Sequence, residues 1–285
     1  MIIISGIIVV IGAVIGGYLM ANGNLFILLQ PAEFFIIIGV AIGIYIIGAP
    51  SNSFKLLFSN IVQALRGKKY GKNDYIQLLS LLHEIFIIIR TKGLREIESH
   101  IVNPHKSSLF KQYPRILRDQ IALIFIVDII RNIVSTTLSA HELESLLDNQ
   151  LESVNEESLQ TAKSVSDMAD SLPAIGIVAA VLGIVITMQK LDQPPAILGH
   201  SIGAALVGTF IGILLSYGFL APVGRKLEEL ASEERSYLDT IRVSFVSLTG
   251  GAHFKVATEF GRMVIPPKNR PSFNELEKVL KKKLS

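Results

Sequence analysis

The residues of this sequence that could support chemistry are small and polar residues set into long apolar runs. In the segment DSLPAIGIVAAVLGIVITM, five of them recur at steps of three and four: Pro173, Gly176, Ala180, Gly183 and Thr187. On a helix they share one narrow face. Such a face lets a second helix come close, while the bulky Ile, Val and Leu faces can meet lipid or neighbouring spans. The segment therefore predicts a helix-packing span of a membrane protein.

A second seam of this kind lies in the apolar run that starts at residue 201. Ala205, Thr209, Gly212 and Ser216 follow one another at steps of four, three and four. Gly208 and Gly212 signal close helix contact. The Thr209 hydroxyl needs a hydrogen-bond partner inside the run. Bonding back to a carbonyl of its own helix is the more common arrangement, and a role in a polar path is the alternative.

Two prolines stand on the same two runs. Pro173 lies near the start of the first run, and Pro222 lies at the end of the second. A proline frees a backbone carbonyl and bends a helix, although near a helix end it is often merely tolerated. Taken together, the two residues are a candidate hinge pair.

Ionisable side chains are missing from the interior of the apolar runs. Every Asp, Glu, Lys, Arg and His stands at or outside the ends of these runs. An ionisable group inside a membrane span is costly and is typical of channels and pumps. The sequence therefore predicts that this chain cannot by itself carry protons through a bilayer by a carboxylate relay.

Signatures of enzymes and metal sites are also missing. The sequence has no Walker loop, no H-E-x-x-H motif, no G-x-S-x-G motif and no cysteine, and its six histidines are scattered. We expect no enzymatic activity, no cofactor and no metal site. The formal net charge of +3 is modest, so we expect no nucleic acid as a partner.

The elements that must position these residues are membrane spans. Half of the 285 residues are hydrophobic and 18% are charged, which is too apolar for an ordinary soluble domain. Four runs can each supply the roughly 20 apolar residues of a spanning helix. They predict spans near 2–21, 34–50, 172–189 and 201–221. A cleaved signal peptide is the alternative for the first run, which lacks a basic flank and is too long for one.

Charge predicts how the spans are oriented, because Lys and Arg near span ends stay in the cytoplasm. Residues 51–170 carry 14 Lys and Arg, and residues 223–285 carry 12. The connection 22–33 holds only Glu33, and the connection 190–200 holds only Lys190, Asp192 and His200. Both large segments and both termini are therefore expected in the cytoplasm, with two short loops outside.

The polar segments also predict helices, and no alternation is long enough for a sheet. Helices are expected at 54–67, from Asp74 to a break at Gly93, and from Pro114 to 138. In the last of these, the apolar run Ile121–Val127 is too short for a fifth span and indicates a packed core helix. Polar helices at 139–170 and 225–248 continue the third and fourth spans, and a short helix starts near Ser272.

These observations predict an all-α membrane protein with four transmembrane helices and a large helical cytoplasmic domain between the second and third spans. The third and fourth spans extend into the cytoplasm. The expected segments are a transmembrane hairpin at 1–50, a cytoplasmic domain at 51–170, the third and fourth spans at 171–222, and C-terminal helices with a tail at 223–285.

One group of charges surrounds the expected helix break at Gly93. Arg90, Lys92, Arg95, Glu96 and Glu98 place both signs at one exposed turn. Such a turn can dock a charged partner, and a plain solvated turn is the more common alternative.

Several stretches of the sequence resemble the flagellar stator subunits of the MotA type, in the MotA/TolQ/ExbB proton channel family. They are DSLPAIGIVAAVLGIVITM, ALVGTFIGILLSYGFLAP, YPRIL, FIVDIIR, EFGR and RPSFNELE. The similarity runs from the first span to about residue 280, and the stretch in the third span is the most specific.

The resemblance implies a stator subunit of the bacterial flagellar motor, located in the inner membrane. With the partner MotB it would form a proton channel that converts ion-motive force into torque on the rotor protein FliG. Two MotB copies would supply the ion-binding aspartate that this chain lacks. Five copies of this chain would surround them, with the third and fourth spans inside.

The resemblance also implies roles for single residues. Arg90 and Glu98 match the rotor-facing charges of the family, Pro173 and Pro222 match its channel prolines, and Thr209 matches its pore threonine. Ala180 stands where sodium-driven relatives have a second threonine, which favours protons. The alternatives are a sodium-driven stator, an energising subunit like ExbB or TolQ, and a purely structural membrane scaffold.

Overall fold

The computed structural model describes residues 2–48, 64, 67 and 70–284. All regular secondary structure in this part of the chain is helical. The helix expected at 54–67 falls almost entirely outside the described residues. The chain forms two compact units, each built from two stretches of sequence. Unit 1 comprises Met1–Gly67 and Glu157–Leu230, and unit 2 comprises Lys68–Glu156 and Ala231–Ser285.

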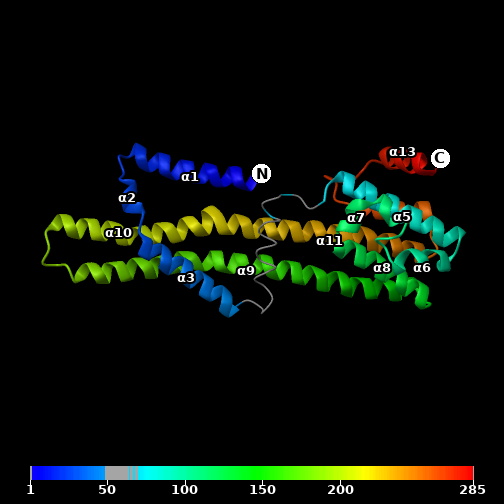
Figure 1. The fold of residues 1–285 in the computed structure, drawn as a ribbon, viewed down its shortest axis with the longest axis horizontal. Helices are drawn as coiled ribbons and strands as arrows, with labels where there is room; N and C mark the ends of the chain where they lie inside the picture. Colours follow the sequence, from blue (N-terminus) through cyan, green and yellow to red (C-terminus); the bar gives the residue numbers. More distant parts are fainter. Residues whose placement is uncertain (1, 49–63, 65–66, 68–69, 285) are drawn as a thin grey trace. The chain divides into compact units, whose positions relative to one another are not determined.

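Within the described residues, four helical stretches are long and apolar enough to cross a membrane, which confirms the predicted number of spans. The first two are joined through a short helix. Helix α1 (Ile2–Met20) ends in a turn that contains Asn22 with a φ of 57°, and the short helix α2 (Leu25–Leu28) leads into α3 (Pro31–Gly48). The Asn24 side chain caps α2 by accepting a hydrogen bond from the backbone N–H of Phe26. Helix α1 contacts η2 (Leu214–Leu220), whereas α3 contacts α10 (Pro195–Ile213). Figure 1 shows α1, α2 and α3 in blue.

The third and fourth spans are parts of longer helices, as the sequence predicts. Helix α9 (Ala140–Met188) runs without interruption from polar sequence into the third span. Helix α10 (Pro195–Ile213) leads through a π-helical segment, η2 (Leu214–Leu220), into α11 (Ala221–Thr249). Helix α11 stops at Gly250, and Gly251 adopts a φ of 91°, which favours glycine.

Two of the spanning helices begin earlier than the apolar runs indicate, and each begins at a proline. Helix α3 starts at Pro31 and α10 at Pro195. Proline suits the first helical turn because its missing N–H would have no partner there. Consequently Glu33 and His200, which the sequence had assigned to outer loops, belong to the spanning helices.

Unit 2 is a bundle of shorter helices around a core of large side chains. Its helices are α5 (Lys72–Thr91), α6 (Leu94–Val102), η1 (Phe110–Gln112), α7 (Pro114–Arg118), α8 (Gln120–Ser135), α12 (Phe254–Val264) and α13 (Phe273–Leu284), together with the ends of α9 and α11. The break at Gly93 is confirmed, because this glycine adopts a φ of 86° between α5 and α6. The rings of Tyr70 and Tyr237 stack in the core at 4.0 Å.

The single helix expected from Pro114 to 138 is wrong, because the chain breaks at Asp119. This residue ends α7 and caps α8, and its carboxylate accepts hydrogen bonds from the Ala122 N–H and the Tyr70 hydroxyl. These two bonds replace the helical continuation. Helix α8 buries Phe125 and Ile126 in the unit 2 core, so the run Ile121–Val127 is a core helix, as predicted.

Candidate functional site

Helices α9 and α10 touch through their glycines. A Cβ atom on Gly176 would lie 2.8 Å from the carbonyl oxygen of Gly208, and one on Gly212 would lie 2.6 Å from that of Leu172. A Cβ on Gly183 would lie 2.7 Å from the Cβ of Ala205. The seams predicted on the two runs therefore face each other, with α10 beside α9 (Figure 1), and the backbones are too close for larger side chains.

The hydroxyl of Thr209 is directed at the neighbouring helix. Its Oγ1 lies 3.5 Å from the carbonyl oxygen of Gly176 on α9, at the long limit of a hydrogen bond. The more common arrangement, a bond to a carbonyl of its own helix, is therefore not the one observed. Thr187 does adopt it, since its hydroxyl donates to the Gly183 carbonyl at 2.8 Å. Thr209 is thus the more available hydroxyl of the two.

The two prolines have different local consequences. Helix α9 continues through Pro173, which lies directly after Leu172 at the contact with Gly212. Pro222, in the first turn of α11, follows the π-helical segment η2. A proline has no N–H and its ring clashes with the carbonyl four residues earlier, so a regular turn cannot form at that point. The Ala221 N–H donates instead to the Ser216 carbonyl, five residues back.

The remaining candidate of the third span is Ala180, which is buried. Next to it on α9, exposed apolar side chains border the buried seam, among them Ile177, Val181 and Ile184. An exposed apolar face on a spanning helix is suited to lipid or to other spans. Gly176, Gly183, Gly208, Gly212 and Thr209 therefore lie along the contact of α9 with α10, whereas Pro222 lies beyond η2 on α11.

A buried carboxyl group at this contact was missed by the sequence reasoning. Glu33 is only 8% exposed, and its carboxyl reaches between Gly183 of α9 and Gly208 of α10. A Cβ on Gly208 would lie 2.6 Å from Oε2, and one on Gly183 would lie 3.2 Å from Oε1. Oε2 has no hydrogen-bond partner among the described residues. The available signal was Pro31, which starts the helix one turn earlier and brings Glu33 onto its buried side.

The charges around Gly93 form a separate surface in unit 2. Arg90, in the last turn of α5, is exposed, and its guanidinium donates to the Ala252 carbonyl at 3.2 Å. Glu98 is exposed on α6, and no ion pair joins it to any residue that the structure describes. The turn therefore presents a cation and an anion whose charges are available to a partner.

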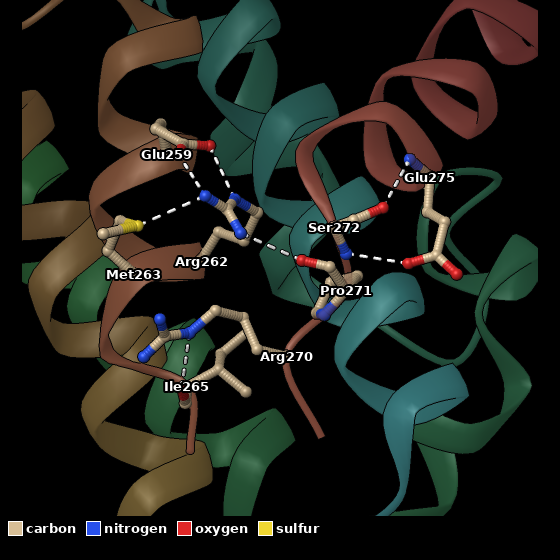
Figure 2. A network of polar contacts seen from close by, with 8 residues as sticks. All are labelled: Glu259, Arg262, Met263, Ile265, Arg270, Pro271, Ser272 and Glu275. Atoms are coloured by element: carbon tan, nitrogen blue, oxygen red, sulfur yellow. Dashed lines mark hydrogen bonds and ion pairs between the residues drawn. The ribbon is translucent and has the colours of Figure 1, made fainter. Parts of the chain in front are cut away.

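The stretches EFGR and RPSFNELE have a structural role in unit 2, as Figure 2 shows. The Arg262 guanidinium donates to both carboxylate oxygens of Glu259, at 2.8 and 2.6 Å, and to the Pro271 carbonyl at 3.0 Å. Ser272 and Glu275 then form a reciprocal cap at the start of α13. These contacts fasten α13 to α12. The two motifs are thus explained by folding and lie outside the α9–α10 contact.

Comparisons with known proteins give a consistent result. The family model for the motility protein A N-terminal region matches residues 4–93, and that for the MotA/TolQ/ExbB proton channel family matches residues 117–240. The chain is 42% identical over 277 residues to motility protein A from Salmonella typhimurium, covering 97% of this chain and 94% of that protein. It is 36% identical over 275 residues to the chemotaxis protein LafT from Vibrio parahaemolyticus, covering 96% of each chain.

Two solved structures have the same fold. The C. jejuni MotAB structure matches with a TM-score of 0.77 and 20% identity, over 95% of this chain and 98% of that chain. The flagellar MotAB stator complex from Bacillus subtilis matches with a TM-score of 0.70 and 23% identity, over 94% and 96%. The helical fold of this chain is thus shared with these proteins.

Proposed function

The chain belongs to the motility protein A family, and on that premise we propose that it is the stator subunit that shapes an ion path for a partner chain. The observation that carries this proposal is the contact of α9 with α10. It is built by glycines, it holds the Thr209 hydroxyl, and the sequence has no Asp, Glu, Lys, Arg or His at 171–189 or 201–224. A proton carrier for the middle of the path must come from elsewhere.

The partner that fits is a single-span chain with a carboxylate in its span, as in MotB. A neutral helix-packing surface with one polar hydroxyl can accept such a span without a competing charge. We place Pro173, Ala180, Thr209 and Pro222 along the ion path. Stators are rings in this family, so five copies of this chain around two copies of the partner is the assembly to test.

The ion proposed for this path is the proton. A sodium ion that sheds water needs several replacement oxygens, whereas a proton passed to a carboxylate needs only a polar path. The methyl group of Ala180 offers no oxygen, and the Thr209 hydroxyl is a single one. A sodium-driven stator is the alternative, and an energising subunit like ExbB or TolQ is less favoured by the 42% identity to motility protein A over most of the chain.

The torque is proposed to leave through the charged turn at Gly93. Arg90 and Glu98 are exposed on two helices that meet there, and their charges can attract complementary charges on the rotor protein FliG. This requires unit 2 to lie in the cytoplasm, which agrees with the Lys and Arg content of residues 51–170 and 223–285. Both termini are then cytoplasmic, and the membrane is the bacterial inner membrane.

Proton flux into vesicles tests the proposal. Vesicles containing this chain alone should conduct almost nothing, and flux should appear when the single-span partner with its aspartate is added. A partner whose aspartate is replaced by asparagine is the matched control, and vesicles that contain it should show no proton flux. Appreciable flux through this chain alone would overturn the shared-channel mechanism. In cells, swimming should survive replacement of sodium by potassium and stop with a protonophore, and sodium-dependent swimming would overturn the proton assignment.

A further inference from the structure

The buried carboxyl of Glu33 has no role in the function proposed so far. It lies on the buried stripe of α3, where Glu33, Ile37, Ala41 and Tyr45 follow one another at steps of four. The other three members of this stripe are apolar or aromatic. A glutamate at such a position replaces an apolar residue in a helix contact, which costs free energy unless the carboxyl has a partner.

The space for this carboxyl is made by two glycines on two different helices. Its oxygens occupy the volumes that a side chain on Gly183 or Gly208 would fill. Ala179 and Ala205 stand beside these glycines and add only methyl groups. Because Oε2 has no hydrogen-bond partner among the described residues, the pocket fits the carboxyl by shape and leaves this oxygen able to accept a hydrogen bond or a proton.

Positive charges are absent from the part of the described chain that packs against Glu33. Helix α2 has no ionisable residue, and α9 has none between Ser171 and Met188. On α10 the only one is His200, which is exposed and eight residues before Gly208, about 12 Å along the helix axis. Lys190, in the connection after α9, is exposed and seven residues after Gly183, and no ion pair joins it to Glu33. Within the described residues no cation therefore balances an ionised Glu33, and a bound proton is what can neutralise it.

The same geometry disfavours a metal cation at this position. A desolvated cation needs several oxygen ligands, but the nearest hydroxyl on α10, that of Thr209, is directed at the Gly176 carbonyl. The glycine-lined pocket otherwise presents methyl groups and backbone. A proton needs only one carboxylate oxygen. The site is therefore selective for protons by its lack of further ligands.

We propose that Glu33 is a second proton-binding site of the stator, carried by this chain, which takes up protons near the α9–α10 connection before they reach the partner's carboxylate. This inference rests on the proposed function, in which α9 and α10 border the ion path. Gly183 lies five residues, about 8 Å, before the end of α9, so the carboxyl is close to the aqueous end of the helix pair. The step is proton transfer only: a hydronium ion gives its proton to the Glu33 carboxylate and becomes water, and the O–H bond on Glu33 breaks when the next water or the partner's carboxylate accepts the proton.

Labelling with a hydrophobic carbodiimide tests proton binding directly, because this reagent modifies protonated carboxyl groups in apolar sites. The complex of this chain with its single-span partner would be treated in membranes over roughly pH 5 to 9, and modified peptides would be identified by mass spectrometry. We expect modification at Glu33 that declines as pH rises. Glu33→Gln should lose it, whereas His200→Gln should leave its pH profile unchanged. No modification of Glu33 at any pH would overturn the proposal.

Rotation speed at low load then tests whether the bound proton matters. Glu33→Gln keeps the shape of the side chain, so membrane abundance and co-purification with the partner should be unchanged while speed falls several-fold. Glu33→Asp should restore part of the speed, since it keeps a carboxyl. Full speed of Glu33→Gln at all external pH values would overturn the role. A parent chain that fails to support rotation would instead refute the proposed function, and the labelling of Glu33 does not depend on that outcome.

Discussion

Unit 1 is packed through backbone and small residues, whereas unit 2 is packed through large side chains and paired charges. In unit 1 the carbonyl of Gly208 would meet any side chain placed at Gly176. In unit 2 the aromatic rings of Phe86 and Phe245 meet at 5.1 Å, and Arg242 lies within salt-bridge distance of Asp239 and Asp148. The backbone contacts of unit 1 cannot accommodate an added side chain, because the backbone cannot change conformation as a side chain can.

Polar groups follow the same division. Within the described residues, the buried side-chain atoms without a hydrogen-bond partner are Glu33 Oε2 and Ser216 Oγ in unit 1, and Gln77 Oε1 in unit 2. Both atoms of unit 1 lie on spanning segments, where water is scarce and an open hydrogen-bonding valence is costly. In unit 1 the unpaired oxygens of Glu33 and Ser216 are therefore the positions at which an ion or a partner would supply the missing hydrogen bond.

The largest effect is expected from filling the glycine contact of unit 1. Gly212→Ala would bring a methyl group to 2.6 Å from the Leu172 carbonyl, so α9 and α10 must separate at a cost of about 1–3 kcal/mol. We expect loss of most motility and of co-purification with the partner. Gly203→Ala on the same helix is the control, because no described residue outside its own stretch of helix lies within 4 Å of the added atom. Equal swimming of the two variants would mean that the helix contact is not tight.

A smaller effect is expected from breaking the charge network of unit 2. Arg262→Ala would remove the donors to Glu259 and Pro271, and we expect a local loss of about 2 kcal/mol. Amide hydrogen exchange of α12 and α13 in the intact complex measures this loss, and exchange in α13 should accelerate. Lys281→Ala is the control, since its ion pair with Glu277 is exposed and contributes little. If both variants exchange like the parent, unit 2 does not depend on this network.

A still smaller effect is expected from pH, which acts on unit 2 through His83. Burial and the nearby Lys255 lower the pKa of this imidazole, whose Nδ1 lies 3.1 Å from the Thr258 hydroxyl oxygen. Below about pH 6.5 the unfolded chain takes up a proton that the folded state resists, so the unfolding temperature should fall as pH is lowered from roughly 7.5 to 5.5. Calorimetry of the complex measures this fall. His83→Gln should reduce the slope, and an unchanged slope would assign the pH dependence to other groups.

The smallest effect on structure is expected from the charges at the Gly93 turn. Arg90→Glu and Glu98→Lys alter exposed side chains, so the stability of unit 2 should change by less than about 0.5 kcal/mol. Torque should nevertheless fall if these charges meet the rotor as proposed, because their sign is inverted. Swimming at low expression and membrane abundance measure the two effects separately, and charge reversal on FliG should restore part of the swimming. Normal swimming of both single variants and of the double variant would show that these residues are ordinary surface.

The periodicity of small residues was sufficient to predict that α9 and α10 each meet another helix closely, because only glycine and alanine allow backbones so close, but it did not predict that they meet each other. The continuous helix α9 could also be predicted, because its polar half contains no glycine or proline that would interrupt it. The break at Asp119 was missed, since an aspartate inside a helical pattern becomes a cap only when a distant residue such as Tyr70 completes it. Glu33 was missed because the end of the apolar run was taken as the end of the span, although Pro31 starts the helix earlier.

The π turn before Pro222 affects how the fourth span could be exchanged between relatives. A wider turn takes up one more residue than an α turn, so the side chains after Leu220 are rotated by about 100° from where a regular helix would put them. This rotation therefore sets the angle between the glycine seam on α10 and the buried face of α11 formed by Gly224, Leu227 and Leu230. A chimaera joined within residues 214–220 can import another α10 while the phase of α11 is preserved.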